Sequence, residues 1–355
     1  GRRGFKVNTT VVTVDKEHPD EKVMEEAGRV LKEGGLVAFP TETVYGLGGD
    51  GLNPDSSRKI YQAKGRPSDN PLIIHIADME SLDKIVKAIP LKARKMAEAF
   101  WPGPLTMIFE KSSVVPYETT GGLESVAVRM PSHPVAAALI RAGGGYVAAP
   151  SANTSGRPSP TRASHVREDL EGKIDMIIDG GSVGIGLEST IVDFTEDEPV
   201  ILRPGYINQE MMEDVIGQVK VDRGLLITDE NVRPKAPGMK YRHYAPQASL
   251  TIVEGKAEDT IAYINTQCAK LKAEGKGAGV IATDETRGRY QAAVVKSIGT
   301  RRDEEGIARH LFGILREFDE EKVDAIFSES FDTPKMGQAI MNRLLKAAGH
   351  HIIRL

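Results

Sequence analysis

Short apolar segments rich in β-branched residues alternate with amphipathic segments along most of this chain. The run 8–15 and the run Leu36–Phe39 have the composition of strands. Between them, apolar residues recur at helical spacing across 20–33, and Gly34 and Gly35 follow. The pattern therefore predicts a strand, a helix that ends at the glycine pair, and a second, buried strand that ends at Pro40.

Further short apolar runs predict more strands of the same kind, at 71–76, 105–109, 125–129, 146–149, 176–179 and 189–193. Amphipathic stretches predict helices at 82–88, 91–100 and 134–142. Several of these strands follow one another without an intervening helix, so they cannot all be joined by parallel crossovers. We therefore predict an N-terminal α/β domain with a twisted mixed sheet and flanking helices.

The pattern starts again at Leu250. Strands are expected at 250–253, 277–282 and 323–327, and they alternate with expected helices at 257–274, 303–318 and 335–348. Regular alternation of this kind predicts a smaller parallel sheet with Rossmann-like winding. No Gly-x-Gly-x-x-Gly follows a strand here, so a dinucleotide site is not predicted.

The segment between these two regions has no apolar periodicity. It contains three prolines between Arg233 and Pro246, together with cationic and aromatic side chains. A proline-rich segment without periodicity is typical of an extended linker. We therefore divide the chain into a first domain at 8–222, a linker that could act as a lid at 223–249, and a second domain at 250–355.

Composition and charge narrow the functional classes. The chain has 355 residues with 40% hydrophobic and 27% charged, which is ordinary for a globular protein of two domains. Its formal net charge of −4 gives no general attraction to nucleic acid, although a local basic pocket is compatible with it. A single cysteine, Cys268, suits a reducing cytoplasm. No apolar run reaches the length of a membrane span, and we expect no membrane partner.

Polar clusters follow several predicted strands. In Phe39–Gly48 a strand runs into hydroxyls and glycines, which suits either a tight turn or one wall of a ligand site. Lys64 and Arg66 would point the same way in an extended backbone and face an anion, or they could be a solvated surface pair. His75 alone is more typical of a core histidine.

Two more arginines stand at strand ends. Arg129 ends one predicted strand and suits bidentate binding of a carboxylate or phosphate, with a structural ion pair as the rival interpretation. Arg203 ends another, and the loop 150–161 is dense in hydroxyls. Together with Lys64 and Arg66 they favour a polyanionic ligand. The sequence has no Gly-x-x-x-x-Gly-Lys-[Ser/Thr] loop, no zinc-ligand spacing and no Gly-x-Ser-x-Gly elbow.

These motifs, taken in order, resemble the YrdC-like domain of the L-threonylcarbamoyladenylate synthases. The resemblance is carried by Phe-Pro-Thr-Glu-Thr-Val-Tyr-Gly-Leu-Gly (39–48), Lys-Gly-Arg-Pro (64–67), Asn-Pro-Leu-Ile-Ile-His (70–75), Trp-Pro-Gly-Pro-Leu-Thr (101–106), Val-Ala-Val-Arg-Met-Pro (126–131), Ala-Pro-Ser-Ala-Asn (149–153) and Leu-Arg-Pro-Gly (202–205). The linker and the tail resemble the longer, two-domain form of that family, so the resemblance spans nearly the whole chain.

The resemblance implies an activity and a set of residues. It implies synthesis of L-threonylcarbamoyl-AMP from L-threonine, bicarbonate and ATP, with release of pyrophosphate and with Mg²⁺ as cofactor. The product would pass to the machinery that modifies the adenosine beside the anticodon of tRNA. The implied catalytic signature is Lys64, Arg66, Ser151 and Asn153. The implied threonine site is Thr43, His75, Arg129, Ala149 and Ser189. The implied ATP site is Arg66, Asn70, Ser125, Ser151, Ser159, Arg203 and Tyr244. No protein metal ligand is implied.

Other functional classes stay open from the residues alone. The main alternative is an RNA-binding module that grips the phosphate backbone without ATP turnover, and contact with tRNA is compatible with either function. Further alternatives are an accessory domain for another carbamoyl adenylate and a regulatory protein whose tail senses a ligand. The net charge of −4 and the lack of basic runs argue against the RNA-binding module.

Overall fold

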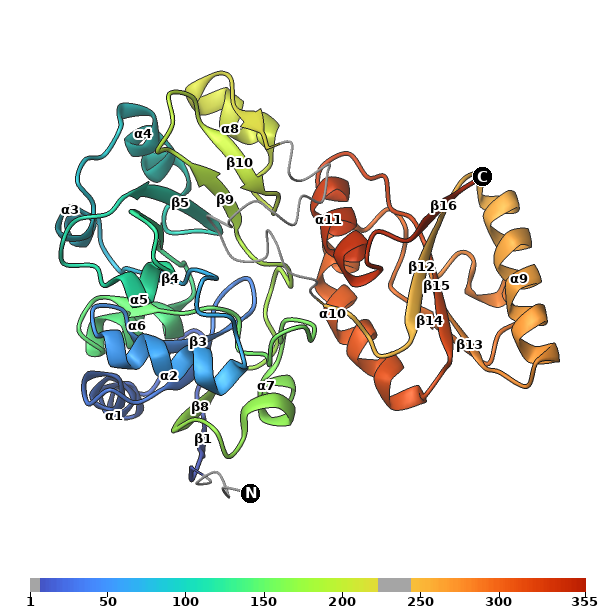
Figure 1. Cartoon of the computed structure of the whole chain (residues 1–355), viewed down its shortest axis with the longest axis horizontal. Coiled ribbons are helices and arrows are strands. Elements are labelled where there is room, and N and C mark those ends of the chain that lie inside the picture. The colour runs from blue at the N-terminus through green and yellow to red at the C-terminus, as the bar shows by residue number, and fades with distance from the viewer. Residues whose placement is uncertain (1–6, 223–243) are drawn as a thin grey trace. The chain divides into compact units, whose positions relative to one another are not determined.

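The computed structural model describes residues 7–222 and 244–355, and the chain divides into two compact units. Unit 1 holds residues 1–155, 159–184 and 188–240, and unit 2 holds residues 156–158, 185–187 and 241–355. Most of the predicted linker, 223–249, lies outside the described residues, and so does the part of it expected to act as a lid. Each unit is described separately below (Figure 1).

Unit 1 is built on a mixed sheet of eleven strands. The strands run in the order β1-β8-β2-β3-β7-β4-β6-β5-β9-β10-β11. Their bounds are β1 Thr10–Thr13, β2 Val37–Pro40, β3 Tyr45–Asp50, β4 Ile73–His75, β5 Leu105–Glu110, β6 Ser125–Arg129, β7 Val147–Ala148, β8 Met176–Asp179, β9 Thr190–Asp193, β10 Val200–Arg203 and β11 Lys220–Val221. Parallel pairs such as β4 with β6 stand beside antiparallel pairs such as β5 with β6, so the predicted mixed sheet is confirmed.

Eight helices accompany this sheet in the described part of unit 1. They are α1 Glu21–Lys32, α2 Pro54–Lys64, α3 Glu80–Ile85, α4 Leu91–Phe100, α5 Tyr117–Thr120, α6 Pro134–Ala142, α7 Ala163–Leu170 and α8 Gln209–Ile216. Helices α1 and α6 share one core with β2 and β8, while α2 and α7 share another with β3 and β8. A third core joins α3, α4 and α8 to β5 and β6. Burial of these apolar faces is the main favourable contribution to folding.

Sequence analysis overlooked α2 and β3. The buried face of α2 includes Ser56, Ser57 and Lys64, so apolar periodicity is weak there. Strand β3 is rich in glycine, because a Cβ at Gly48 would come within 3.0 Å of both the Phe39 ring and the Val147 side chain. Packing between neighbouring strands, not strand propensity, therefore determines that segment.

Unit 2 is built on a parallel sheet of five strands in the order β14-β13-β15-β12-β16. The strands are β12 Ser249–Glu254, β13 Ala278–Ala282, β14 Val294–Ser297, β15 Ala325–Glu329 and β16 Ile352–Arg354, and the helices are α9 Ala257–Ala273, α10 Glu304–Glu321 and α11 Gly337–Ala347. Helix α9 lies on one side of this sheet, and α10 and α11 lie on the other (Figure 1). The expected small parallel α/β domain is confirmed, with β14 and β16 as strands that its periodicity did not predict.

Candidate active site

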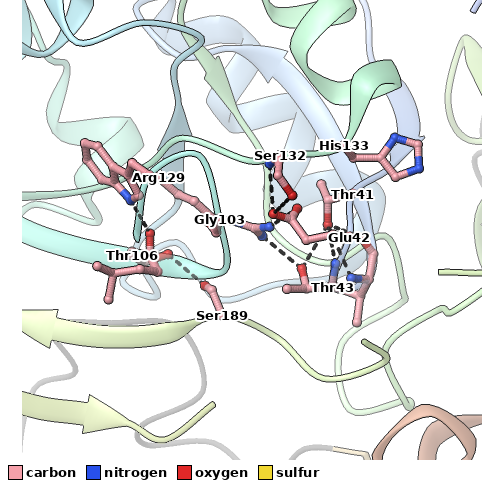
Figure 2. A network of polar contacts seen from close by, with 12 residues as sticks. Thr41, Glu42, Thr43, Gly103, Thr106, Arg129, Ser132, His133 and Ser189 are labelled. Atoms are coloured by element: carbon pink, nitrogen blue, oxygen red, sulfur yellow. Dashed lines mark hydrogen bonds and ion pairs between the residues drawn. The ribbon is translucent and has the colours of Figure 1, made fainter. Parts of the chain in front are cut away.

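A tight turn after β2 presents two polar side chains to the centre of unit 1. The Thr41 hydroxyl donates to the carbonyl of Val44 at 2.7 Å and accepts from the backbone N–H of Thr43 at 3.1 Å. Thr41 is 2% exposed, so these contacts are shielded from water. The hydroxyl of Thr41 thus fastens the turn, which leaves the side chains of Glu42 and Thr43 to reach across the sheet (Figure 2).

Arg129 lies opposite this turn, at the end of β6. Its Nη1 donates to the Thr43 hydroxyl at 2.9 Å, its Nε donates to the Gly103 carbonyl at 3.3 Å, and its Nη2 forms a salt bridge with Glu42. The arginine side chain is 4% exposed, and the carboxylate side chain of Glu42 is 14% exposed. Three partners, two on this turn and one in the loop before β5, fix the guanidinium in a single orientation.

Glu42 is held from its other side as well. The backbone N–H of Ser132 donates to its Oε2 at 2.8 Å, and the Ser132 hydroxyl donates to the same atom at 2.7 Å. Burial acts to raise the pKa of Glu42, but Arg129 and the two bonds from Ser132 outweigh it and lower the pKa below its ordinary value. Glu42 is therefore an ionised carboxylate at neutral pH.

The sheet register brings two more polar residues beside Arg129. In β4, His75 pairs with Arg129, and in β5, Thr106 pairs with Arg129. His75 is 4% exposed, and its Nδ1 lies 3.1 Å from the Ile73 carbonyl. Burial, with a contribution from Arg129, lowers the pKa of His75 to about 3. The imidazole is therefore neutral at physiological pH.

A second pair of hydroxyls connects Thr106 to the start of β9. The hydroxyls of Thr106 and Ser189 lie 2.7 Å apart. Arg203, in β10, donates from its Nε to the Ser189 carbonyl at 2.9 Å and from its Nη2 to the Ser189 hydroxyl at 3.2 Å. Figure 2 shows the Ser189 hydroxyl beside that of Thr106, and Ser189 thus links the row that contains Arg129 to a second buried arginine.

Lys64 and Arg66 do not lie on an extended segment, so that expectation is wrong. Lys64 is the last residue of α2, and Gly65 ends the helix in the left-handed region at φ 63°. The Lys64 ammonium donates to the Ser151 carbonyl and, at 2.6 Å, to the Asn153 carbonyl. Arg66 donates to the carbonyls of Asn70 and Pro71 at 3.2 and 2.8 Å. Both cations are buried, so the surface-pair interpretation also fails.

The remaining implied residues occupy loops and strand ends around these cations. The Asn70 Oδ1 is buried and makes no hydrogen bond within the described residues, while the Asn153 amide donates to the Thr154 carbonyl at 2.9 Å. The Ser159 hydroxyl donates to Glu188 at 2.8 Å. Ala149 is buried directly after β7, and Ser125 is half-buried at the start of β6.

Tyr244 was predicted to contact ATP from the linker. It is the first residue of the second described range, 244–355, is 4% exposed and has a positive φ of 64°. Its ring stacks on Phe312 of α10, with 4.7 Å between the ring centroids. Its predicted contact with ATP remains a prediction.

Sequence analysis overlooked three residues of this site: Glu42, Thr106 and Ser132. Glu42 and Thr106 lie inside the motifs 39–48 and 101–106, and Ser132 directly follows the motif 126–131, but none was given a role, and the partner of each is distant in the chain. Glu42 meets Arg129 at a separation of 87 residues, and Thr106 meets Ser189 at a separation of 83. The signal that could have found Glu42 is a carboxylate in a polar turn after a buried strand, in a chain with an unexplained strand-end arginine.

The described part of the chain offers neither a cluster of metal-ligand side chains nor a membrane-spanning helix. Residues 7–222 and 244–355 contain no group of three or more His, Cys, Asp or Glu side chains that could hold a metal ion. Over the same ranges, no helix combines the length and apolarity needed to cross a bilayer. The candidate site in unit 1 is rich in cations and hydroxyls, and the carboxylates of Glu42 and Glu188 are hydrogen-bonded among them.

Two family models match this chain. The first, described as "Telomere recombination", matches residues 29–205, and the second, described as "Threonylcarbamoyl-AMP synthase, C-terminal domain", matches residues 207–349. The chain is 50% identical to the threonylcarbamoyl-AMP synthase of Bacillus subtilis, over 97% of this chain and 98% of the relative. It is 48% identical to the synthase of Pyrococcus abyssi, over 98% of this chain and 100% of the relative.

A solved structure adds a comparison of folds. The crystal structure of Pyrococcus abyssi Sua5 complexed with L-threonine superposes with a TM-score of 0.93 at 48% identity. The superposition covers 98% of this chain and 100% of the other. The architecture of both units is therefore shared with a protein that binds L-threonine.

Proposed function

This chain belongs to the threonylcarbamoyl-AMP synthase family, and we propose that the buried cluster around Arg129 is its amino-acid site. It is an enzyme of that family, which decides between catalysis and the RNA-binding alternative. Its reaction joins L-threonine, bicarbonate and ATP into L-threonylcarbamoyl-AMP and releases pyrophosphate. The observation that carries the proposal is the fully oriented, buried guanidinium of Arg129.

Arg129 would bind the carboxylate of L-threonine. An arginine has five N–H donors, and its three protein partners leave donors for a further anion. Thr43, Ser189 and the neutral His75 would supply contacts to the amino acid, with Ala149 packing against it. A charge-assisted bond in a site shielded from water is about twice as strong as a neutral one.

Lys64, Arg66 and Arg203 would take the phosphates of ATP, with Asn70, Ser125, Ser151, Asn153, Ser159 and Tyr244 completing the nucleotide site. The three cations are buried and oriented by carbonyls, so they need little reorganisation when the nucleotide arrives. The unsatisfied Oδ1 of Asn70 supports this assignment, because a buried acceptor without a partner costs about 1–3 kcal/mol unless a ligand or water fills it.

The proposed reaction has two bond-forming steps. The threonine amine attacks the carbon of CO₂ and passes a proton to solvent, or it attacks bicarbonate and that proton leaves with the displaced hydroxide as water; either route gives a carbamate. A carbamate oxygen then attacks the α-phosphorus of ATP in line, and the bond to pyrophosphate breaks. Such chemistry depends mainly on positioning and on stabilising charge, which suits a site of cations and hydroxyls.

Mg²⁺ would enter with ATP and act as part of the substrate. The ion usually keeps several waters and binds substrate phosphates with one or two carboxylates, so it needs no dedicated cage. This coordination preference is compatible with the described residues, which contain no preformed cluster of metal-ligand side chains. We further propose that the product passes to the tRNA-modifying machinery and that the protein acts in the cytoplasm, for which the single buried Cys268 is the support.

Mass spectrometry tests the proposed function directly. Purified protein is mixed with Mg²⁺, ATP, bicarbonate and one amino acid at a time. A carbamoyl adenylate that forms with L-threonine, and pyrophosphate in equal amount, is the expected result. Phosphate release without an adenylate, or an adenylate that forms equally with any amino acid, would contradict the proposal.

A further inference from the structure

Two opposite charges dominate the proposed amino-acid site. Arg129 is a buried cation, and Glu42 is the carboxylate in contact with it. His75, the neighbouring titratable group in the sheet, is neutral at physiological pH because burial holds its pKa at about 3. His133 also faces Glu42, and burial lowers its pKa as well. The charges facing the substrate head group therefore sum to about zero, with the positive and negative ends side by side.

We propose that Glu42 binds the α-ammonium of the substrate and makes the site selective for a zwitterion. This inference rests on the proposed function, because it assigns a second recognition element to the same site. An α-amino acid carries its two charges on groups bonded to the same carbon, which suits an arginine and a carboxylate in direct contact. Arg129 alone would accept any carboxylate. The pair of Arg129 and Glu42 discriminates against an acid that has no ammonium group.

The contacts of Glu42 leave room for this role. Its Oε1 accepts one bond, from Arg129, and its Oε2 accepts two, from Ser132. A carboxylate offers about four acceptor positions in all, so Oε1 retains capacity for a further donor. The Glu42 side chain is 14% exposed while the Arg129 side chain is 4% exposed, so the carboxylate is the more accessible partner.

A purely structural role for Glu42 is the competing explanation. A buried arginine needs a countercharge, and Glu42 supplies one. That role would affect every ligand of Arg129 by the same factor, because it acts only through the guanidinium. A role in recognition affects only ligands that carry the ammonium. The ratio of two affinities therefore separates the explanations, whereas the loss of one affinity does not.

Calorimetry with three ligands measures that ratio. The ligands are L-threonine, its 2-hydroxy analogue (which lacks only the ammonium) and L-threoninamide (which lacks only the carboxylate charge). For the wild-type protein, L-threonine should bind about 10- to 100-fold more tightly than the 2-hydroxy analogue. In Glu42→Gln this preference should fall to within about threefold, while the preference over L-threoninamide persists. Glu42→Asp, which keeps the charge, should recover part of the selectivity.

The outcomes are distinct. Equal losses for L-threonine and the 2-hydroxy analogue in Glu42→Gln would make Glu42 a structural countercharge and overturn the inference. If Glu42→Gln does not fold, the wild-type series still decides, since binding of the 2-hydroxy analogue as tightly as L-threonine overturns the inference without any variant. Failure of the wild-type protein to form a threonine-dependent adenylate would instead overturn the proposed function.

Discussion

Among the described residues, Arg129 pairs with Glu42 in unit 1 and Arg301 pairs with Glu329 in unit 2, and the two pairs are buried in opposite ways. In unit 1, the Arg129 side chain is 4% exposed and its partner Glu42 is 14% exposed. In unit 2, the carboxylate is the buried member: the Glu329 side chain is 5% exposed, and its partner Arg301 is 41% exposed. Both carboxylates also accept hydrogen bonds from hydroxyl groups. Glu42 accepts one from Ser132, and Glu329 accepts one each from Thr286 and Tyr290.

The difference in which member is buried indicates which pair suits ligand binding. Arg129 is a buried cation with N–H donors that its protein partners do not use. A substrate carboxylate bound there would form charge-assisted hydrogen bonds that water does not weaken. Glu329, at the end of β15, is surrounded by donors from its own unit, and Arg301 is open to water and also donates to the Ser330 carbonyl at 2.9 Å. We interpret the ion pair of Arg301 with Glu329 as a structural contact that holds the ends of strands to the loops that follow them. Four experiments test this contrast.

Removal of the two arginines should give the largest difference. Arg129→Ala should lower kcat/KM for L-threonine about a thousandfold, because the proposed charge-assisted bonds to the substrate carboxylate, worth about 4 kcal/mol of transition-state stabilisation, would be lost. Arg301→Ala should stay within about threefold of wild type, because this arginine is half exposed. Pyrophosphate release at varied L-threonine concentration measures both. A comparable loss in Arg301→Ala would show that the second pair also serves the reaction.

The pH dependence of stability should reveal the buried histidine beside the first pair. His75 has a pKa of about 3 in the folded state and an ordinary value near 6.5 when unfolded. The unfolded state binds the proton first, so the stabilisation is present above about pH 6.5 and is lost as the pH falls. Between pH 7 and pH 5, wild type should lose about 2 kcal/mol more than His75→Gln.

Denaturant unfolding at several pH values measures this loss. The lower limit of pH 5 keeps the carboxylate of Glu42 outside the test, because its lowered pKa confines its loss of stabilisation to below about pH 4.5. Parallel curves for wild type and His75→Gln would mean that the histidine takes up its proton in the folded state.

Neutralising the Glu329 carboxylate should lower the stability of the fold without changing catalysis. Glu329→Gln should lower the free energy of unfolding by about 1–2 kcal/mol, because Thr286 and Tyr290 keep an acceptor and the exposed Arg301 can be hydrated. Thermal unfolding of the full chain measures the change, and calorimetry should give an unchanged L-threonine affinity. A weakened affinity would show that the ion pair of Arg301 with Glu329 in unit 2 affects L-threonine binding in unit 1.

Hydroxyl removal should give the smallest effects. Ser132→Ala deletes one of the bonds to Glu42 and should raise KM for L-threonine about fivefold, which corresponds to about 1 kcal/mol. Tyr290→Phe deletes the matching bond to Glu329 and should leave that KM unchanged. Steady-state kinetics of the two variants side by side provides the comparison. An equal rise in both variants would remove the functional distinction between the pairs.

The strands around the site were largely predictable from sequence. Strand β6 has the predicted bounds, Ser125–Arg129, because a short, mostly buried run with three consecutive apolar residues between loops leaves a clear local signal. Helix α2 was overlooked because its buried face is partly polar, although Asn53 as N-cap and Pro54 at its first turn are recognisable start signals.

The pairing of site residues was not predictable in the same way. The implied threonine site includes Thr43, and the structure places the Thr43 hydroxyl on Arg129 while the Thr41 hydroxyl fastens the turn. The salt bridge of Arg129 with Glu42 depends on the register of strands far apart in the chain, which no local pattern encodes. The motifs therefore supplied the residues proposed for the site, and only the fold showed which of them lie in contact.

The position of β1 has a consequence for biosynthesis. This first strand lies at the edge of the sheet beside β8, with Thr10 opposite Met176, and the Thr9 hydroxyl donates to the Ile174 carbonyl 165 positions away. At ordinary rates of translation, the ribosome needs on the order of ten seconds to make the intervening chain. During that time the nascent strand has no native neighbour, so the N-terminal segment is the part of unit 1 that a chaperone would meet first.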